Sequence, residues 1–138
     1  MATWIIRPAV TADIDAVLSF WLGSDAMASS TDDAAALTVL ITGFGGLLLA
    51  ERAGAVIGTL IATWDGWRGN MYRLVVDRDA RRQGVALALV AAGERRLAGL
   101  GCRRISALVI DAHDHAVGFW SAAGYAADPT LKRYVKML

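Results

Sequence analysis

The chain has 138 residues, the length of one typical domain, and 56% of them are hydrophobic. Only 20% are charged, and 14 basic residues against 13 acidic ones leave a formal net charge of +1. This composition excludes a disordered chain, and the balanced charge argues against binding to nucleic acid or to an anionic membrane through overall charge. No linker or internal repeat is present, so the sequence predicts a single domain over residues 1–138.

Cysteine usage and hydropathy narrow the class of protein further. Cys102 is the only cysteine, which excludes an internal disulfide and a cysteine-based metal cluster. With no basic-then-apolar leader at the N-terminus, we expect a reduced, cytoplasmic protein. The longest apolar stretch, residues 37–63, contains Glu51, Arg52 and several glycines, so we expect no membrane span.

The first half of the chain predicts two helices followed by a hairpin. Apolar spacing and turn residues indicate, in chain order, a strand at 4–8, a helix from a Thr11 cap to Gly23, a helix at 34–41 closed by Gly43, and a hairpin of strands at 47–52 and 55–63. Asp32 and Asp33 lie at the start of the second helix, where negative charge is favoured.

The second half alternates strands and helices. The same signals indicate a loop at 64–70, a strand at 71–76, a helix at 83–98 ended by Gly99 and Gly101, a strand at 105–110, a helix at 116–123, and strands near Tyr125 and at 131–138. The apolar stripe of the long helix is expected to consist of Ala86, Val90, Gly93, Leu97 and Leu100.

These elements define an expected fold class. The continuous apolar run at 105–110 predicts a central strand buried on both faces. Strand, helix and strand over 71–110 imply a parallel pair joined by a right-handed crossover, whereas the hairpin implies antiparallel pairing. The fold is therefore expected to be α/β, with a mixed central sheet and helices on both faces.

The most informative segment for chemistry is residues 75–86, where a strand ends and a helix opens. Small residues at Gly84 and Ala86 let an anion approach the unpaired N–H groups of the first helical turn, and Arg81 and Arg82 add positive charge. A phosphate or pyrophosphate fits this arrangement, and an ordinary solvated helix start is the alternative. The chain has no Gly-Lys-Ser/Thr phosphate loop, and residues 43–48 lack the third glycine of a dinucleotide fingerprint.

The segment Arg81-Arg82-Gln83-Gly84-Val85-Ala86 resembles the R/Q-x-x-G-x-G/A signature of the GNAT family of N-acetyltransferases, with Ala at the last position. The resemblance extends over nearly the whole chain. Further segments similar to the family are Ile6-Arg7-Pro8-Ala9 with Asp13, the set Ala116, Trp120, Gly124 and Tyr125, and Arg133-Tyr134-Val135-Lys136.

The resemblance implies an N-acetyltransferase that moves an acetyl group from acetyl-CoA to a primary amine by direct attack in a ternary complex. It implies two splayed parallel strands, at 71–76 and 105–110, that admit the cosubstrate. Val76 N–H would polarise the thioester carbonyl. The residues implied to contact the cosubstrate are Leu74, Val75, Val76, Arg81, Arg82, Gln83, Gly84, Val85, Ala86, His113 and Trp120.

Two departures from the family pattern leave acid and base unassigned. Tyr72 lies near a position where many members carry a glutamate base, and a phenol is protonated at neutral pH. Trp120 replaces a tyrosine that protonates the departing thiolate in many members, and an indole N–H donates a hydrogen bond without giving up its proton. Asp65, Asp111, His113 or a water chain remain open as the base. His113 is a catalytic hypothesis because an imidazole titrates near neutral pH, and a solvent-exposed histidine is the alternative.

The acceptor side is less specific. The resemblance implies that the loop with Trp64, Asp65 and Trp67, together with Tyr72, borders the acceptor, and aromatic walls with a carboxylate would suit a cationic amine. The segment 25–33 between the first two helices is similarly placed by the resemblance. Packing in the core, or a subunit contact in a homodimer, is the alternative for the tryptophans. No metal is expected, since His113 and His115 lack a third ligand.

Two classes of function remain open. The first is an acetyltransferase whose acceptor is a small-molecule or peptide amine. The second is a module that binds CoA with little or no turnover, which the residues at positions 72 and 120 favour. The preserved segment 81–86 supports cosubstrate binding under both hypotheses.

Overall fold

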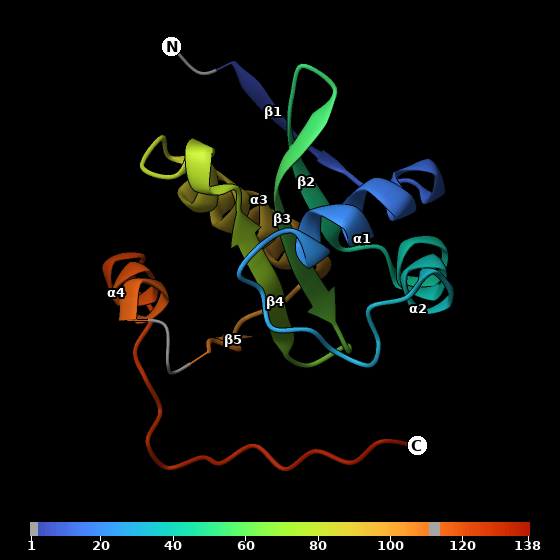
Figure 1. The fold of residues 1–138 in the computed structure, drawn as a ribbon. Helices are drawn as coiled ribbons and strands as arrows, with labels where there is room; N and C mark the ends of the chain where they lie inside the picture. The colour runs from blue at the N-terminus through green and yellow to red at the C-terminus, as the bar shows by residue number, and fades with distance from the viewer. Residues whose placement is uncertain (1–2, 111–113) are drawn as a thin grey trace. The chain divides into compact units, whose positions relative to one another are not determined.

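The computed structural model describes residues 3–110 and 114–138. The chain divides into two compact units, with the boundary in the sequence between Leu108 and Val109. The first unit contains the sheet and most helices (Figure 1). Its elements are β1 (Trp4–Pro8), a 3-10 turn (Thr11–Asp13), α1 (Ile14–Leu22), α2 (Ala34–Val39), a π-helical turn (Leu40–Phe44), β2 (Leu47–Arg52), β3 (Ala55–Trp64), β4 (Gly69–Val76), a 3-10 turn (Arg78–Ala80), α3 (Val85–Leu100) and β5 (Ile105–Ala107). The second unit contains α4 (Asp114–Ala122).

The five strands form one mixed sheet in the order β1-β2-β3-β4-β5. The first four pair antiparallel, and β4 pairs with β5 in parallel. The predicted mixed sheet and the predicted parallel pair around α3 are therefore confirmed. The hairpin between β2 and β3 turns through Ala53 and Gly54, at φ 50° and 80°, as the sequence predicted.

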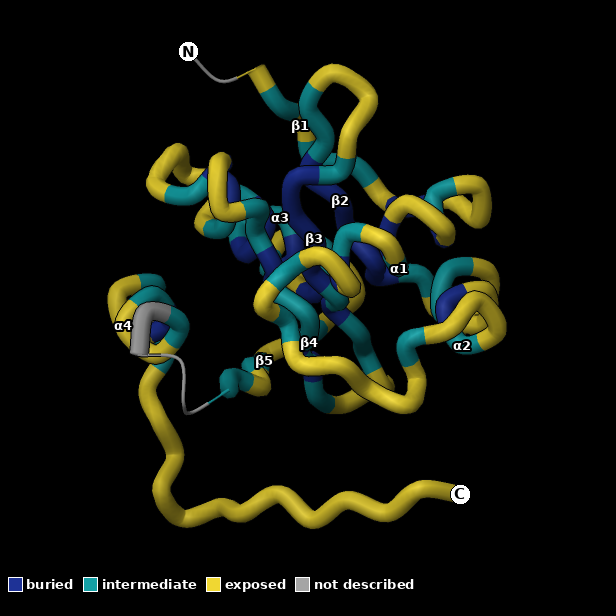
Figure 2. The backbone as a smooth tube through the Cα atoms, viewed as in Figure 1, coloured by how far each residue is buried: buried dark blue, intermediate teal, exposed yellow. Residues whose placement is uncertain are grey.

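Helices cover both faces of this sheet, which confirms the predicted layering. Successive strand residues point to opposite faces. Thr59 of β3 meets Trp21 of α1, whereas its neighbour Gly58 lies against Val85 and Leu89 of α3. Figure 2 shows the buried positions concentrated in β2 and β3 and on the helical turns that face them. The sheet is thus the centre of the hydrophobic core, and it fixes the positions of the loops at the ends of its strands.

Three helix boundaries differ from the sequence prediction. Thr11 does not cap α1; the chain forms a 3-10 turn there, and the Asp13 carboxylate accepts the Val10 N–H at 2.8 Å while Arg7 holds it. α2 ends at Val39 and continues as a π-helical turn. α3 begins at Val85, passes through Gly99 and ends at Leu100.

The buried stripe of α3 is also rotated from the predicted one. It consists of Val85, Leu89, Val90, Gly93 and Leu97. Leu100, predicted to be buried, is 48% exposed, and Ala86 is half-buried. Apolar residues at a four-residue spacing from Val85 also form one continuous helix face. Packing against β3 and β4 decides that this face, and not the predicted one, is buried.

Strand boundaries around the later elements differ as well. Trp64 pairs with Gly69, so the predicted loop 64–70 is a shorter turn at 65–68. The predicted central strand 105–110 is a three-residue edge strand whose side chains are partly exposed. No strand is assigned near Tyr125 or at 131–138, and Tyr134 there is 91% exposed. Alternating hydrophobicity predicts a strand only where a neighbour supplies the hydrogen bonds.

The start of β2 generates a stability prediction, because Gly46 adopts a φ of 97° and a Cβ there would overlap the Ala62 carbonyl. Gly54 has a φ of 80° but faces open space, so it serves as the matched control. We expect Gly54→Ala to cost about 1 kcal/mol from the left-handed backbone alone, and Gly46→Ala to cost about 3 kcal/mol or more. Urea unfolding measures both, and equal losses would contradict the steric argument.

Candidate functional site

The second half of β4 is an open sheet edge. β5 pairs with β4 only from Gly69 to Met71, and Leu108 N–H adds one more bond to the Met71 carbonyl at 3.0 Å. Beyond that point, within residues 3–108, positions 72–76 of β4 pair with β3 alone. We call residues 72–76 the open edge of β4.

The backbone of Val76 faces this open edge. Asp77 N–H donates to the Ile57 carbonyl of β3 at 2.8 Å, and in an antiparallel pair the next residue points its groups the other way. The Val76 carbonyl accepts a long bond of 3.4 Å from Arg81 Nε, on the side away from β3. By the same alternation Leu74 faces the open edge, whereas Val75 pairs with Thr59 of β3.

A β-bulge interrupts β4 within this open edge, two residues before Val76. Thr59 pairs with Val75 but Ile61 pairs with Tyr72, so two residues of β4 oppose one of β3. Arg73 has a φ of 55° at the bulge. The fully buried Thr59 hydroxyl donates to the Arg73 carbonyl at 2.9 Å and accepts Trp21 Nε1 at 2.9 Å.

The segment after β4 forms the predicted helix-start loop. Arg82 and Gly84 have φ values of 63° and 85°, and α3 starts at Val85. Gly84 is the N-cap, no side chain caps the first turn of α3, and that turn holds no acidic residue. Its N–H groups and the positive end of the helix dipole therefore suit an anion.

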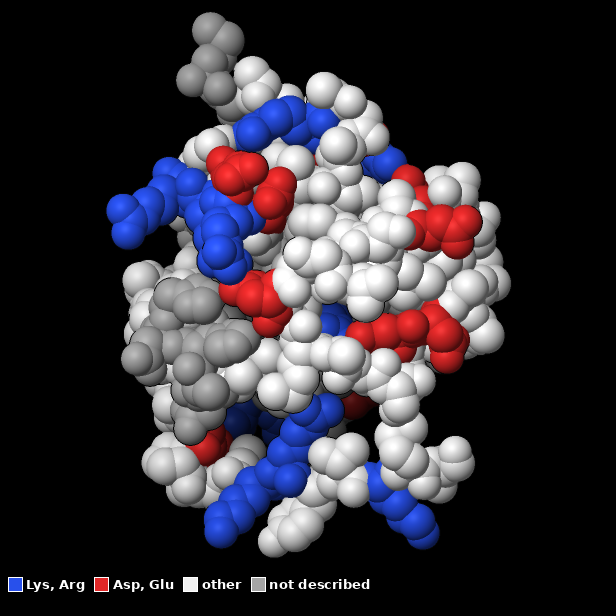
Figure 3. All heavy atoms as spheres, in the orientation of Figure 1, with Lys and Arg blue, Asp and Glu red and all other residues white. Residues whose placement is uncertain are grey.

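Side chains of this loop reach two other parts of the first unit. Arg81 Nη2 contacts both carboxylate oxygens of Asp25 at 3.1 and 3.0 Å, and Gln83 accepts a hydrogen bond from Arg52. Arg82 is exposed. Figure 3 shows basic side chains gathered over the loop that follows β4, with acidic side chains beside them.

A hollow of about 500 Å³ lies between this loop and the C-terminal end of α1. Its lining includes Val76, the last residue of β4, as well as residues of the basic loop. The lining residues are Ser19, Phe20, Gly23, Ser24, Asp25, Val76, Asp77, Arg78 and Arg81. Val76 and Arg81 of the helix-start loop therefore line one hollow.

The residues predicted to border the acceptor do not line this hollow beside Val76. Tyr72 is half-buried on the open edge of β4. Trp64 ends β3, and Asp65 and Trp67 lie in the turn at 65–68, which is separated from Val76 by the length of β4, about 23 Å. The Asp65 carboxylate faces its own turn and accepts the Trp67 and Arg68 N–H groups at 2.8 and 2.7 Å. These two bonds hold the pKa of Asp65 below its usual range.

The surroundings of that turn are positive. A second hollow, of about 560 Å³, is lined by Trp64, Gly66, Trp67, Arg68, Leu100, Gly101, Arg103 and Arg104. Three of these residues are arginines, and Arg68 lies 4.1 Å from the Trp67 ring centroid. No carboxylate lines this hollow, so its charge suits an anion better than the cationic amine expected from the sequence.

Residues of the second unit complete the account of the predicted site. Trp120 is 7% exposed and packs edge-on against Phe119 and Tyr125, with ring centroids 5.5 and 4.8 Å away. His113 and Asp111 lie outside the described residues.

Among the described residues, no cluster of three or more His, Cys, Asp or Glu could hold a metal ion. No described helix is long and apolar enough to cross a membrane.

The sequence did not single out the residues that hold the bulge. Thr59 is polar within the apolar run 55–63, and Arg73 is charged within a predicted strand. Both are signals of a special position, but neither indicates which residue it meets. Asp32 was assigned to the start of a helix, whereas its carboxylate contacts Arg73 of β4 at 2.6 Å.

Comparison with known proteins places the chain among acetyltransferases. A model of the acetyltransferase (GNAT) family matches residues 15–125. An acetyltransferase of Yersinia enterocolitica is 33% identical over 84 residues, which are 61% of this chain and 60% of the relative. An acetyltransferase of Pectobacterium atrosepticum is 30% identical over 82% of this chain and 81% of its own length.

The fold has close counterparts among solved structures. The structure of AAC(6')-Iy in complex with the bisubstrate analogue CoA-S-monomethyl-acetylneamine superposes with a TM-score of 0.78. The match covers 99% of this chain and 100% of that one, at 18% sequence identity. At that identity the likeness establishes the fold.

The turn at 65–68 generates a prediction about pH. Because the folded-state pKa of Asp65 is lowered, its carboxylate stabilises the turn at neutral pH and loses that effect as the pH falls through the folded-state pKa. We expect the difference in melting temperature between the wild type and Asp65→Ala to be largest at neutral pH and to narrow in acid. A difference that stays constant with pH would contradict this role of the carboxylate.

Proposed function

The chain belongs to the acetyltransferase (GNAT) family, and from that premise we propose that it transfers an acetyl group from acetyl-CoA to a primary amine. The observation that carries the proposal is the open edge of β4, followed after residues 77–84 by a helix N-terminus without a side-chain cap. An extended cosubstrate arm can pair with such an edge like an added strand, and its phosphates can meet the helix N–H groups.

The cosubstrate is proposed to run along β4 into the helix-start loop. Leu74 and Val76 offer backbone groups on the open edge to the cosubstrate. Val75 lies between them, pairs with β3, and would hold the two neighbouring backbone groups in position. The pyrophosphate would sit on the N–H groups of residues 82–86, where Gly84 leaves open space. Arg81 would exchange its contact with Asp25 for a phosphate oxygen.

The chemical step is proposed to be direct aminolysis. The neutral amine nitrogen attacks the thioester carbonyl carbon, a C–N bond forms, the C–S bond breaks, and CoA leaves as the thiolate. Val76 N–H points toward the open edge and would stabilise the oxyanion that develops on the carbonyl oxygen. The amine proton passes to water, and no covalent enzyme intermediate is needed.

No side chain is assigned as general base or acid. The lowered pKa of Asp65 makes it a weak proton acceptor, and it lies far from Val76. Trp120 is proposed to contact the cosubstrate, and His113 stays a catalytic prediction. Positioning and carbonyl polarisation would then supply most of the rate enhancement.

A single acetyltransferase domain in the cytoplasm, monomeric or homodimeric, remains the expectation from the sequence.

The test of the proposed function is release of CoA thiol from acetyl-CoA in the presence of a panel of amines, from polyamines and amino acids to peptide N-termini and aminoglycosides. We expect turnover with at least one amine. An alkylamine near pKa 10 is only about 0.1% neutral at pH 7, so log kcat/KM should rise with pH at a slope near one.

Replacing each candidate base separates the alternatives. The profiles of His113→Asn, Asp65→Asn and Asp111→Asn should superimpose on the wild type if water takes the proton. A limb near pH 6–7 that disappears only in His113→Asn would identify the imidazole as the base. Binding of CoA without thiol release for any amine would instead identify a CoA-binding module.

Cosubstrate placement is tested at Gly84. Gly84→Glu places a carboxylate where the pyrophosphate would lie and should weaken CoA binding tenfold or more, about 1.4 kcal/mol. Gly101→Glu is the matched control, because Gly101 is also left-handed and open but lies at the other end of α3. Calorimetry that gives both folded variants the same CoA affinity would contradict the proposed placement.

A further inference from the structure

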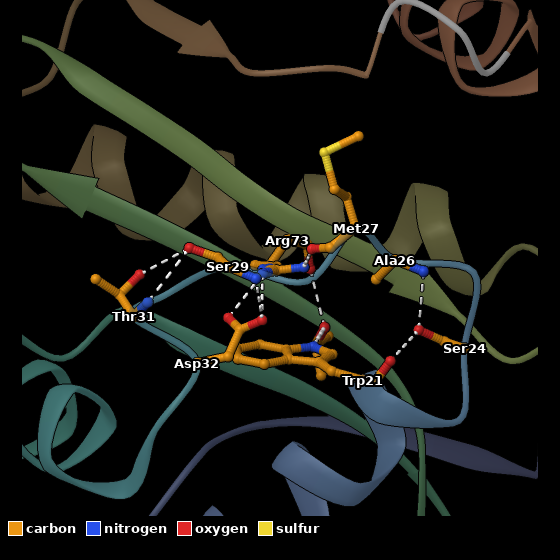
Figure 4. Close-up of polar contacts among 9 residues, drawn as sticks. Trp21, Ser24, Ala26, Met27, Ser29, Thr31, Asp32 and Arg73 are labelled. Carbon is orange, nitrogen blue, oxygen red and sulfur yellow. Dashed lines mark hydrogen bonds and ion pairs between the residues drawn. The ribbon is translucent and has the colours of Figure 1, made fainter. Parts of the chain in front are cut away.

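Arg73 connects the bulge of β4 to the loop between α1 and α2, residues 23–33, which we call the α1–α2 loop. Its Nη2 contacts both Asp32 carboxylate oxygens at 2.6 Å, and its Nη1 donates to the Met27 carbonyl at 2.7 Å. The guanidinium lies 5.0 Å from the Trp21 ring centroid. Figure 4 shows Arg73 lying across Trp21 with Asp32 beside it.

This ion pair differs from an ordinary surface pair. The Arg73 and Asp32 side chains are only 16% and 20% exposed, so water screens them little. Arg73 also adopts a left-handed backbone inside a strand, a conformation that persists only where surrounding contacts fix it. Thr59 fixes its carbonyl, and the α1–α2 loop fixes its side chain.

The same loop forms one wall of the hollow beside the open edge of β4. Gly23, Ser24 and Asp25 line that hollow together with Val76. Within the loop, Asp32 also accepts Ser29 N–H at 2.9 Å, and Ser24 Oγ accepts Ala26 N–H at 3.0 Å. Arg73 therefore links the bulge, through its own backbone, to the loop that carries this wall, through Met27 and Asp32.

We propose that Arg73 and Asp32 form a latch that positions the acceptor amine, with Arg73 as a positioning residue that touches neither substrate. The inference rests on the proposed function. The latch holds the α1–α2 loop over the bulge, so that an amine entering the hollow meets the thioester at a fixed angle beside Val76 N–H. Loosening the latch lowers the fraction of bound amine in an attacking position and leaves the phosphate contacts of residues 82–86 in place.

The experiment uses Asp32→Asn, Arg73→Lys and the double variant in the full chain. Asn keeps the size of Asp32 but loses its charge, and Lys keeps the charge of Arg73 but cannot make the forked contact. Glu51→Gln is the control, because it neutralises the ion pair with Arg7, at 3.0 Å and 23–30% exposure, on β2 away from β4.

We expect each single variant to lower kcat/KM for the amine at least tenfold while the CoA dissociation constant stays within threefold. The double variant should lose no more than the worse single variant, since both act on one contact. Glu51→Gln should match the wild type. Unchanged kcat/KM, losses that multiply in the double variant, a parallel loss of CoA affinity, or an equal loss in Glu51→Gln would each overturn the latch.

Amide hydrogen exchange provides a readout that does not depend on turnover. The amides of Ala26 and Ser29 should exchange faster in Asp32→Asn and Arg73→Lys, and at the wild-type rate in Glu51→Gln. If the wild type acetylates no amine, the proposed function fails, and the exchange rates still decide whether the latch orders the loop. Exchange that is unchanged in both latch variants would overturn it.

Discussion

The bulge in β4 is held by two hydrogen bonds at a single buried hydroxyl, and the geometry of the candidate site depends on it. Thr59 accepts the Trp21 indole N–H and donates to the Arg73 carbonyl, so helix α1, strand β3 and strand β4 meet at one oxygen. A bulge bends a strand and shifts its alternation. Pairing with β5 stops at Met71, just before the bulge, and Val76 presents its backbone at the open edge after it. Without the extra residue of the bulge, the backbone groups on the two sides of β4 would be exchanged between Met71 and Val76, and Val76 N–H would not point toward the edge that we propose for the cosubstrate.

Ion pairs between arginine and acidic residues fix the segments around this edge. Arg7 ties β1 to the start of α1 and to β2, Arg73 ties β4 to the α1–α2 loop, and Arg81 ties the helix-start loop to the same loop through Asp25. A phosphate that reaches Arg81 must compete with Asp25, whereas nothing in the proposed reaction displaces Asp32. In the proposed complex, the cosubstrate would displace the contact of the α1–α2 loop at Asp25 and leave its contact at Asp32 in place. The net charge of +1 conceals this distribution.

The candidate chemistry relies on backbone groups more than on side chains. A single preorganised oxyanion donor contributes about 2.7–4 kcal/mol in enzymes where it has been removed. Val76 N–H is proposed as a donor of this kind, and the first-turn amides of α3 are proposed to hold the pyrophosphate. Strand alternation orients Val76 N–H, and the left-handed residues Arg82 and Gly84 lead into the first turn of α3. Departures at Tyr72 and Trp120 from the usual acid and base residues are therefore compatible with turnover, because a thiolate is a fair leaving group and an amine supplies its own neutral fraction.

Local patterns in the sequence determined the antiparallel hairpin at Ala53-Gly54, the parallel pair around α3, the layering of helices on both faces and the helix-start loop at 81–86, because turn residues and apolar periodicity act over a few neighbours. They overestimated the strands at 105–110 and 131–138, since a strand also needs a partner that the alternation does not specify. Only the tertiary structure decided that Asp32 meets Arg73 across 41 residues, that Thr59 pins a bulge, and that Asp65 turns into its own loop. Contacts between residues far apart in the chain depend on how the strands register, and a one-residue shift at the bulge redirects every group that follows it.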